Sequence, residues 1–540
     1  MKKNSFIQGT VVASISIIIT KILGALYVIP FYKIIGVSGG ALYSYAYTIY
    51  NLFLNISTAG IPIAISMIIS EYYTMNKNDA KERAFKIGNK LVFLLSAISF
   101  VVIFFFAEYI ALFLTSGVTG TNSINDISLV IRAISTCLLI VPFLSVLRGY
   151  LQGHKFIAPT SISQVIEQVV RIIVVLLGSF LAIKVFKLKV AVGVAIALFG
   201  AFIGALIAYI YLFIKKSKDK TLNTDNLVKD DITNKEIFKK IIMYCIPLIL
   251  ISVIQTLYDT VDLKLIIKGL NMIGMSSNNI EVVSSIVVTW APKICMVIVA
   301  ISMGLTTSLI PHMMSSYVKG DMKDVNSKFN QSVSTMLLVT VPMTIVIITF
   351  AKEVYYLFYG ESIYGSTVLM VSAIVNIFMG VLTVMNTALQ GMKKFKIIYI
   401  NTVAGLLVNS ILDIPLIILF NKTIIPPYIA TMCATIIGCF VSYLIVFIYL
   451  KKTLKFNYRP ILHTLKKILI PSLGMILVLV LFKLLVHVKL NYINVLWQLA
   501  LMGIISCAIY IFITYKNGIL EEVLGKSYID KLLRKLKIKK

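Results

Sequence analysis

Apolar runs of about 20 residues recur some fourteen times along this chain of 540 residues, and Lys/Arg-rich segments separate them. A helix of about 20 apolar residues crosses the ~30 Å hydrocarbon core of a bilayer. A backbone in lipid must satisfy its own hydrogen bonds, so the spans should be helices. The pattern predicts an all-α polytopic membrane protein with about fourteen transmembrane helices. The expected spans are 5–33, 41–70, 87–114, 126–150, 157–183, 190–214, 240–268, 281–314, 331–358, 365–391, 396–420, 427–450, 463–486 and 493–515.

Composition excludes several other classes of protein. The chain is 59% hydrophobic and 14% charged, with a mean hydropathy of +0.93, which no soluble globular domain shows. The net charge of +29 comes largely from lysines in short loops, where it sets orientation. No aromatic-interleaved basic module accompanies it, so nucleic acid is not an expected partner. The cysteines lie inside apolar runs and the histidines are scattered, so we expect no metal site.

Loop charge and loop length predict the topology. Basic residues concentrate in alternate loops between the expected spans. The basic loops are 77–86, 148–155, 215–240, 319–328, 393–396 and 451–459, and the main exception to the alternation is the loop with Lys184, Lys187 and Lys189. Basic loops stay in the cytoplasm. With an even number of spans, both termini then lie on the cytoplasmic side of a bacterial cytoplasmic membrane. The predicted parts are an N-lobe of six spans (1–214), a linker (215–239), a C-lobe of six spans (240–450), and two final spans with a basic tail (451–540).

The two halves of the chain resemble each other. The segment from Gly60 to Asp79 matches that from Gly304 to Asp321, and Leu151-Gln152-Gly153 matches Leu389-Gln390-Gly391. The segment 108–113 likewise matches 353–358, and all three pairs keep an offset of roughly 240 residues. A parallel repeat of this kind is typical of transporters. An enzyme acting on glycans would need acid/base residues on a sizeable outer loop, and the expected outer loops hold about a dozen residues or fewer.

Two lysines lie deep in expected spans, where an ionisable residue by default faces a cavity or a partner. Lys21 is near the middle of the first span, and Lys293 lies about twelve residues into the eighth. Pro292 removes a backbone donor and can kink the helix beside Lys293. These lysines belong to different halves, so they could face each other across a central cleft. A structural pairing with a carboxylate is the alternative for each.

Three arginines and one glutamate are further candidates for substrate binding. Glu167 and Arg171 are four residues apart on one helix face, in the order that favours an ion pair, so they form either a self-neutralised pair or a substrate site. Arg132 either snorkels to the interface or lines a cavity. Arg148 either contacts a phosphate of the substrate or only helps to set the orientation of the chain in the membrane.

Two aspartates in the seventh span, Asp259 and Asp262, are candidates for ion coupling or for holding Lys264 or Lys21. The balance of charge inside the spans is nevertheless cationic. Cations facing a water-filled cleft favour an anionic substrate, and a phosphate or pyrophosphate head group meets that demand. A drug-cation exporter should show the opposite sign.

Several segments resemble the multidrug/oligosaccharidyl-lipid/polysaccharide exporter superfamily, and in particular the lipid II flippases of the MurJ type in the Gram-positive branch that includes stage V sporulation protein B. The segments that carry the resemblance are Lys21-Ile22-Leu23-Gly24, Gly39 to Tyr43, Leu147 to His154, Gln164 to Gln168, Gly304 to Pro311, and Leu389-Gln390-Gly391.

The resemblance implies two pseudo-symmetric six-helix lobes around a cationic central cavity, with a final helix pair that helps hold a polyprenyl tail. It implies a monomer that carries an undecaprenyl-pyrophosphate-linked glycan, most simply lipid II, across the membrane by alternating access. Lys21 and Lys293 fall where the family has essential basic residues. Tyr27 and an uncharged residue near Leu54 stand where the Gram-negative branch has arginines, so Arg148, Arg171 or Arg132 would substitute.

No cofactor is expected; a monovalent coupling ion or the membrane potential would drive the cycle. Membrane lipids are the other expected partners. A flippase for another lipid-linked polysaccharide unit and a cation-coupled multidrug exporter remain the alternatives.

Overall fold

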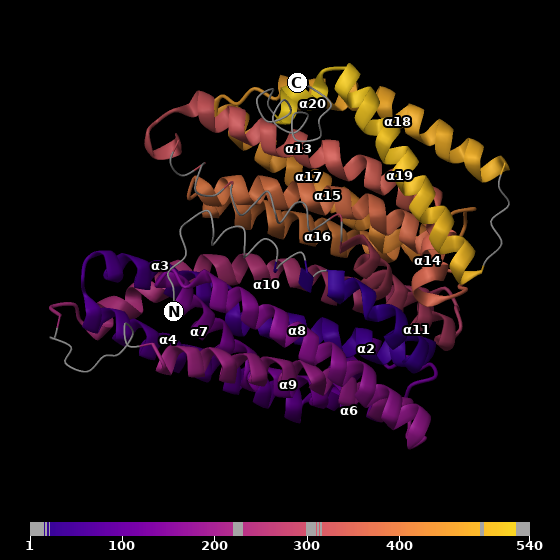
Figure 1. The fold of residues 1–540 in the computed structure, drawn as a ribbon. Helices are drawn as coiled ribbons and strands as arrows, with labels where there is room; N and C mark the ends of the chain where they lie inside the picture. The colour runs from indigo at the N-terminus through magenta and orange to yellow at the C-terminus, as the bar shows by residue number, and fades with distance from the viewer. Residues whose placement is uncertain are drawn as a thin grey trace. The chain divides into compact units, whose positions relative to one another are not determined.

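The structure is a computed structural model that describes residues 16, 19–20, 22–219, 230–296, 298, 309, 313, 316–485 and 491–524. Over these residues the regular elements are all helices (Figure 1). The chain divides into two compact units, Met1–Ser285 and Ile286–Lys540, which are described separately below.

The first unit is a bundle whose core lies between α3, α4, α7, α9 and α10. Buried aliphatic and aromatic side chains from these helices, including Ile65, Tyr150 and Ile241, form one cluster. Its helices are α2 (Val28–Thr58), α3 (Ile61–Thr74), α4 (Asn78–Phe105), α5 (Ala107–Thr115), α6 (Ile124–Ser135), α7 (Val141–Gly153), α8 (Ile157–Phe180), α9 (Val190–Ser217), α10 (Asn234–Met272) and α11 (Ser277–Ser285).

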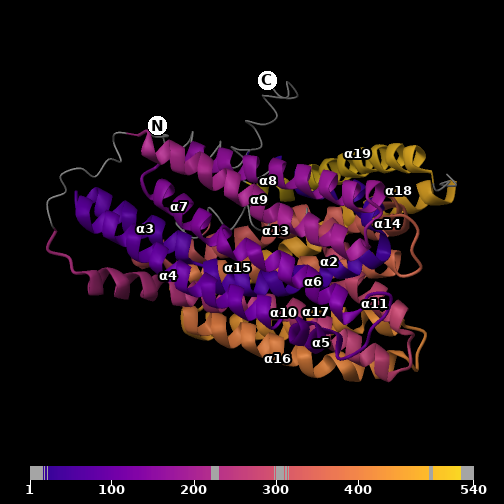
Figure 2. The same cartoon turned by 90° about the horizontal axis from the view of Figure 1, so that it is seen from below.

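The second unit begins with a π-helical turn, η4 (Ile286–Trp290). In this unit α16 packs along α17, and α13 packs on α15 and α18; Figure 2 shows α18 beside α19 at the yellow end of the chain. Its α-helices are α13 (Met322–Thr349), α14 (Ala351–Tyr359), α15 (Gly365–Gly391), α16 (Phe395–Phe420), α17 (Ala430–Leu454), α18 (Arg459–Leu485), α19 (Tyr492–Lys516) and α20 (Ile519–Leu524).

The predicted membrane fold is confirmed. Twelve helices of the described residues are long and apolar enough to cross a membrane. The first of them, Ile22–Tyr73, contains a break at Gly36 (φ 67°, ψ −170°) and covers the second expected span and residues 22–33 of the first. The first half of the expected span 281–314 is described, and its second half, apart from residues 298, 309 and 313, lies outside the described residues. The all-α architecture with about fourteen spans therefore holds.

The predicted boundaries of the third and ninth spans need correction. In place of 87–114 the chain forms α4 and α5, which meet at Phe106, and in place of 331–358 it forms α13 and α14, which meet at Phe350. Both long helices begin earlier than predicted because their first turns are polar, and hydropathy alone does not detect a polar helix extension.

The internal repeat predicted from the sequence is visible in the backbone of each unit. The breaks at Phe106 and Phe350 are related by the repeat offset. Two lysines with left-handed backbones, Lys155 (φ 68°) and Lys393 (φ 57°), are related by the same offset. Each lies one residue before the N-cap of the next helix. Equivalent breaks and turns in two helix series support a duplicated architecture.

The border between the compact units differs from the predicted border between lobes at residue 240. Helix α10 packs with the first unit because polar contacts fasten its start to α3 and α4. Lys240 Nζ lies 2.6 Å from Glu71 Oε1, Arg83 donates to Asn234 Oδ1, and the Asp230 carboxylate accepts from the backbone N–H of Ala80.

A glycine permits a close helix–helix approach at related places in the two units. A Cβ on Gly204 of α9 would lie 2.6 Å from the carbonyl oxygen of Glu167 on α8, and a Cβ on Gly438 of α17 would lie 2.6 Å from that of Gly405 on α16. Small residues allow such approaches between membrane helices, where dispersion contacts supply much of the attraction.

Gly438→Ala should therefore destabilise the protein, because the added methyl group meets backbone rather than a flexible side chain. Overpacking of this kind costs about 1–3 kcal/mol, which should lower the apparent Tm of the purified protein in detergent by several degrees. The matched control is Gly503→Ala in α19, where an added Cβ meets nothing within 4 Å. An equal Tm for the two variants would contradict the close approach.

Candidate functional site

The first unit holds a polar cluster between α7 and α8. Arg148 Nη2 lies 2.8 Å from Glu167 Oε2, and Arg148 Nε donates to Ser163 Oγ at 2.9 Å. The Ser163 hydroxyl, which is fully buried, donates to the Thr160 carbonyl. Both charged side chains are mostly shielded, with 15% and 22% of their surfaces exposed. A charged pair that also has a hydroxyl partner is well accommodated at such a site.

This cluster decides one of the open alternatives. Glu167 forms its ion pair with Arg148 of the neighbouring helix, not with Arg171 four residues along its own. Arg148 thus has a defined partner in addition to any role in orientation.

Arg171 is surrounded by phenol groups. The side chains of Tyr27, Tyr43, Tyr47 and Tyr50 lie close enough for direct electrostatic interaction with the guanidinium. The rings of Tyr43 and Tyr47 stack at 5.3 Å. Within the described residues, no carboxylate lies within ion-pair distance of Arg171, which is half-buried. A phenol is neutral, so these side chains do not cancel the charge of the guanidinium.

Arg132 has a structural partner. Its Nε donates to the carbonyl oxygen of Phe104 at 3.3 Å, in the last turn of α4 before the break at Phe106. The last carbonyls of a helix lack intrahelical donors, and a nearby basic side chain satisfies them. Arg132 therefore supports the junction of α4 with α5.

Lys293 lies in the second unit, one turn after η4. Its Nζ is 4.5 Å from the centroid of the Trp290 ring, and the lysine is half-buried. Trp290 is fully buried. Lys21, the other predicted lysine, lies outside the described residues.

The aspartates predicted for ion coupling lie on α10, Asp259 exposed and Asp262 half-buried. Lys264, one of the two lysines that they could hold, has its Nζ 3.3 Å from the centroid of the Phe113 ring. In the part of the chain that the structure describes, no group of three or more His, Cys, Asp or Glu side chains could hold a metal ion.

Glu281 is one of the buried carboxylates that the sequence did not single out. Glu281 of α11 is 5% exposed and accepts hydrogen bonds from the side chain and the backbone N–H of Asn122. The Asn122 amide also donates to the Ser38 carbonyl at 2.9 Å. This carboxylate fastens α11 to the α5–α6 loop and to α2, and no local motif signals it.

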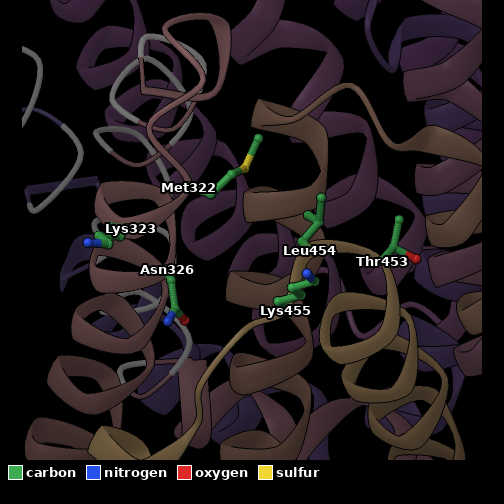
Figure 3. A pocket seen from close by; sticks show the side chains of 6 residues that line it. All are labelled: Met322, Lys323, Asn326, Thr453, Leu454 and Lys455. Atoms are coloured by element: carbon green, nitrogen blue, oxygen red, sulfur yellow. The ribbon is translucent and has the colours of Figure 1, made fainter.

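A pocket of about 480 Å³ lies at the start of α13 and the end of α17. It holds none of the predicted site residues. Figure 3 shows the Lys323 side chain pointing away from Leu454 and Lys455. The lining residues are Met322, Lys323, Asn326, Thr453, Leu454 and Lys455.

The tyrosines around Arg171 were also missed, although a sequence signal exists for them. Three of them lie close together in an expected span, at positions 43, 47 and 50. The polar tip of a buried tyrosine usually finds a hydrogen-bonding or charged partner. Such a run indicates a polar site inside the membrane.

Comparison with known proteins identifies relatives over the whole chain. The model of a family described as polysaccharide biosynthesis protein matches residues 6–273, and that of MatE matches residues 247–414. Lipid II flippase MurJ of Bacillus subtilis (strain 168) is 30% identical over 536 residues, 97% of each chain. Stage V sporulation protein B of the same organism is 24% identical over 363 residues, 67% of this chain and 68% of the relative.

Solved structures show the same fold. Lipid II flippase MurJ in an inward closed conformation superposes with a TM-score of 0.66 at 19% identity, covering 95% of this chain and 99% of that one. An inward-facing multidrug resistance MATE transporter gives 0.61 at 16% identity, covering 82% and 99%. Given the full-length relative at 30% identity, the chain belongs to the MurJ family of the multidrug/oligosaccharidyl-lipid/polysaccharide exporter superfamily, and it is a multi-pass inner-membrane transporter, not an enzyme.

Proposed function

We propose that this protein is a flippase that moves an undecaprenyl-pyrophosphate-linked cell-wall precursor, lipid II, from the inner to the outer leaflet of the cytoplasmic membrane by alternating access. Both termini would lie in the cytoplasm, and a monovalent ion or the membrane potential would drive the cycle. The full-length relative that bears the name lipid II flippase supports this substrate.

The observation that carries the proposal is the setting of Arg171. A cation inside a membrane span is costly unless it has a partner or faces water. Among the described residues, Arg171 has phenols around it but no carboxylate in ion-pair reach, whereas Arg148 is paired with Glu167. Arg171 is thus prepared for an anion that arrives with the substrate, and a planar guanidinium matches a pyrophosphate oxygen pair.

Arg171 would also supply the charge that Tyr27 lacks. Tyr27 stands where the Gram-negative branch of the family has an arginine, and it lies in the group of phenols around Arg171. We propose that Arg171 replaces that arginine from α8, and that Lys21 and Lys293 provide the remaining positive charge for the head group.

The first test is complementation in a bacterium depleted of its essential lipid II flippase, with lipid II in the outer leaflet measured directly. We expect growth and restored exposure of lipid II. Good expression without rescue would contradict lipid II as the substrate and would favour another lipid-linked glycan.

In the same strain, Lys21→Ala and Lys293→Ala should insert normally and fail to restore lipid II exposure, because each removes a cation that the head group needs. Membrane fractionation and immunoblotting control for insertion. Full complementation by either variant would exclude that lysine from the site.

Arg171→Gln should weaken binding of undecaprenyl pyrophosphate to the purified protein at least about tenfold, since a hydrogen bond to a charged group contributes roughly 1.5–3 kcal/mol. Arg171→Lys keeps the charge and should retain part of the affinity. Both are measured by titration in nanodiscs, and equal affinities for wild type and Arg171→Gln would contradict the assignment.

The Arg148–Glu167 pair should behave as a support of the fold. Arg148→Gln and Glu167→Gln should each lower the free energy of unfolding by about 1–3 kcal/mol, which is measured as a lower apparent Tm. The double variant should lose less stability than the sum of the two single losses, because both changes remove the same interaction. Additive losses in this double-mutant cycle would show that the pair contributes nothing to stability.

A further inference from the structure

The setting of Lys293 assigns a role to Trp290 that goes beyond the proposed binding of the head group by the lysine. The ammonium of Lys293 lies 4.5 Å from the centroid of the indole ring. The two residues are three apart in the chain, a spacing that brings side chains to the same face of a helix. A cation over an aromatic face is attracted by the ring quadrupole, and tryptophan gives the strongest attraction of the aromatic residues.

The indole ring is itself firmly held. Trp290 is 0% exposed, and its ring meets that of Tyr359 edge to face with centroids 5.3 Å apart. The Tyr359 hydroxyl donates to the backbone carbonyl of Trp290 at 3.0 Å. One helix, α14, thus fixes both the side chain and the backbone of Trp290.

A second aromatic ring supports Tyr359. The Tyr355 ring lies 5.1 Å from the Tyr359 ring, again in an edge-on arrangement. The Tyr355 ring occupies the space beside Gly365, where a Cβ would lie 2.3 Å from a ring carbon. The ring of Tyr355 thus packs against Gly365 and Tyr359, Tyr359 packs against Trp290, and Trp290 contacts Lys293.

The local backbone is irregular at this point. Residues Ile286–Trp290 form a π-helical turn, and Pro292 has no N–H to donate to the turn before it. Single π-turns inside helices often occur at functional sites. The irregular turn and the aromatic support together fix the direction in which Trp290 presents its ring.

We propose that Trp290 is a positioning residue for Lys293: its indole face, seated by Tyr359, holds the ammonium in place to meet the anionic head group of the substrate. This inference rests on the proposed function of Lys293. A π face attracts the ammonium without neutralising its charge. A carboxylate in the same place would compete with the substrate.

The chain allows a direct spectroscopic test because it has two tryptophans. The other, Trp497 of α19, is 72% exposed, so Trp497→Phe leaves Trp290 as the single fluorophore. In this background, undecaprenyl pyrophosphate added to the protein in nanodiscs should cause a saturable change in the emission of Trp290. Undecaprenol, which lacks the charge, should cause none. An unchanged emission at saturating undecaprenyl pyrophosphate would overturn the proposal.

Substitutions separate positioning from packing. Trp290→Phe keeps a weaker π face and Trp290→Leu keeps only apolar bulk, so affinity for undecaprenyl pyrophosphate should fall in the order wild type, Phe, Leu, with a total loss of roughly three- to thirtyfold. Tyr359→Phe keeps the ring but removes the hydroxyl, and it should give an intermediate loss. Equal affinities for the Phe and Leu variants at equal Tm would show that Trp290 only fills space.

The failure of this inference is distinguishable from the failure of the proposed function. If Lys293→Gln binds and transports like wild type, the role of the lysine itself is wrong. If Lys293→Gln loses binding while Trp290→Leu binds normally, the lysine acts without the indole and only the positioning role is wrong. Loss in both variants, with the emission change abolished by Lys293→Gln, supports the proposal.

Discussion

The cost of placing charge inside a membrane governs the polar interior of this protein. The described basic side chains predicted to bind substrate have different kinds of support within their own units: Arg148 has a carboxylate, Arg132 a backbone carbonyl, Arg171 a group of phenols and Lys293 an indole face. These supports differ in how much charge they cancel. A carboxylate neutralises its cation, whereas dipoles and π faces stabilise a cation and leave its charge available. Among the described residues, the carboxylate of Glu167 therefore balances the charge of Arg148, whereas the phenols near Arg171 do not balance its charge.

Equivalent positions of the two repeats hold a charged hydrogen bond in one unit and a neutral one in the other. Counting from the matched Leu-Gln-Gly segments, Arg148 and Ser163 correspond to Asn386 and Asn401. In the first unit Arg148 Nε donates to Ser163 Oγ at 2.9 Å, and in the second Asn401 Nδ2 donates to Asn386 Oδ1 at 3.0 Å. Both units thus join two successive helices by a buried hydrogen bond at the same place. The bond involves a charged group in the first unit and neutral groups in the second, at the same position of the repeat.

Hydropathy was sufficient to predict the all-α membrane fold, because a helix that crosses a bilayer must expose apolar residues along its whole length. The span 365–391 was predicted at its observed ends, and the spans that failed did so at the polar turns of α4 and α13. Partners across helices were a different matter. Spacing along α8 suggested that Glu167 would pair with Arg171, but the rotation of α7 against α8 brings Arg148 to Glu167 instead. A sequence pattern gives the face of one helix and not its angle toward a neighbour, so the tyrosines around Arg171 and the indole beneath Lys293 emerged only from the structure.

The need to balance a positive charge explains why Glu167 of the first unit has no acidic counterpart in the second. Glu167 corresponds to Gly405 in the repeat. Where the hydrogen-bonded pair is Asn386 with Asn401, there is no net charge to balance, and a glycine suffices at 405, against which Gly438 packs. Where the pair contains Arg148, a half-buried cation would remain unbalanced without a carboxylate, and Glu167 provides it from the adjacent helix while its backbone carbonyl still receives Gly204. The glutamate therefore balances the arginine, and the close glycine contact is present in both units because it is made to a backbone carbonyl.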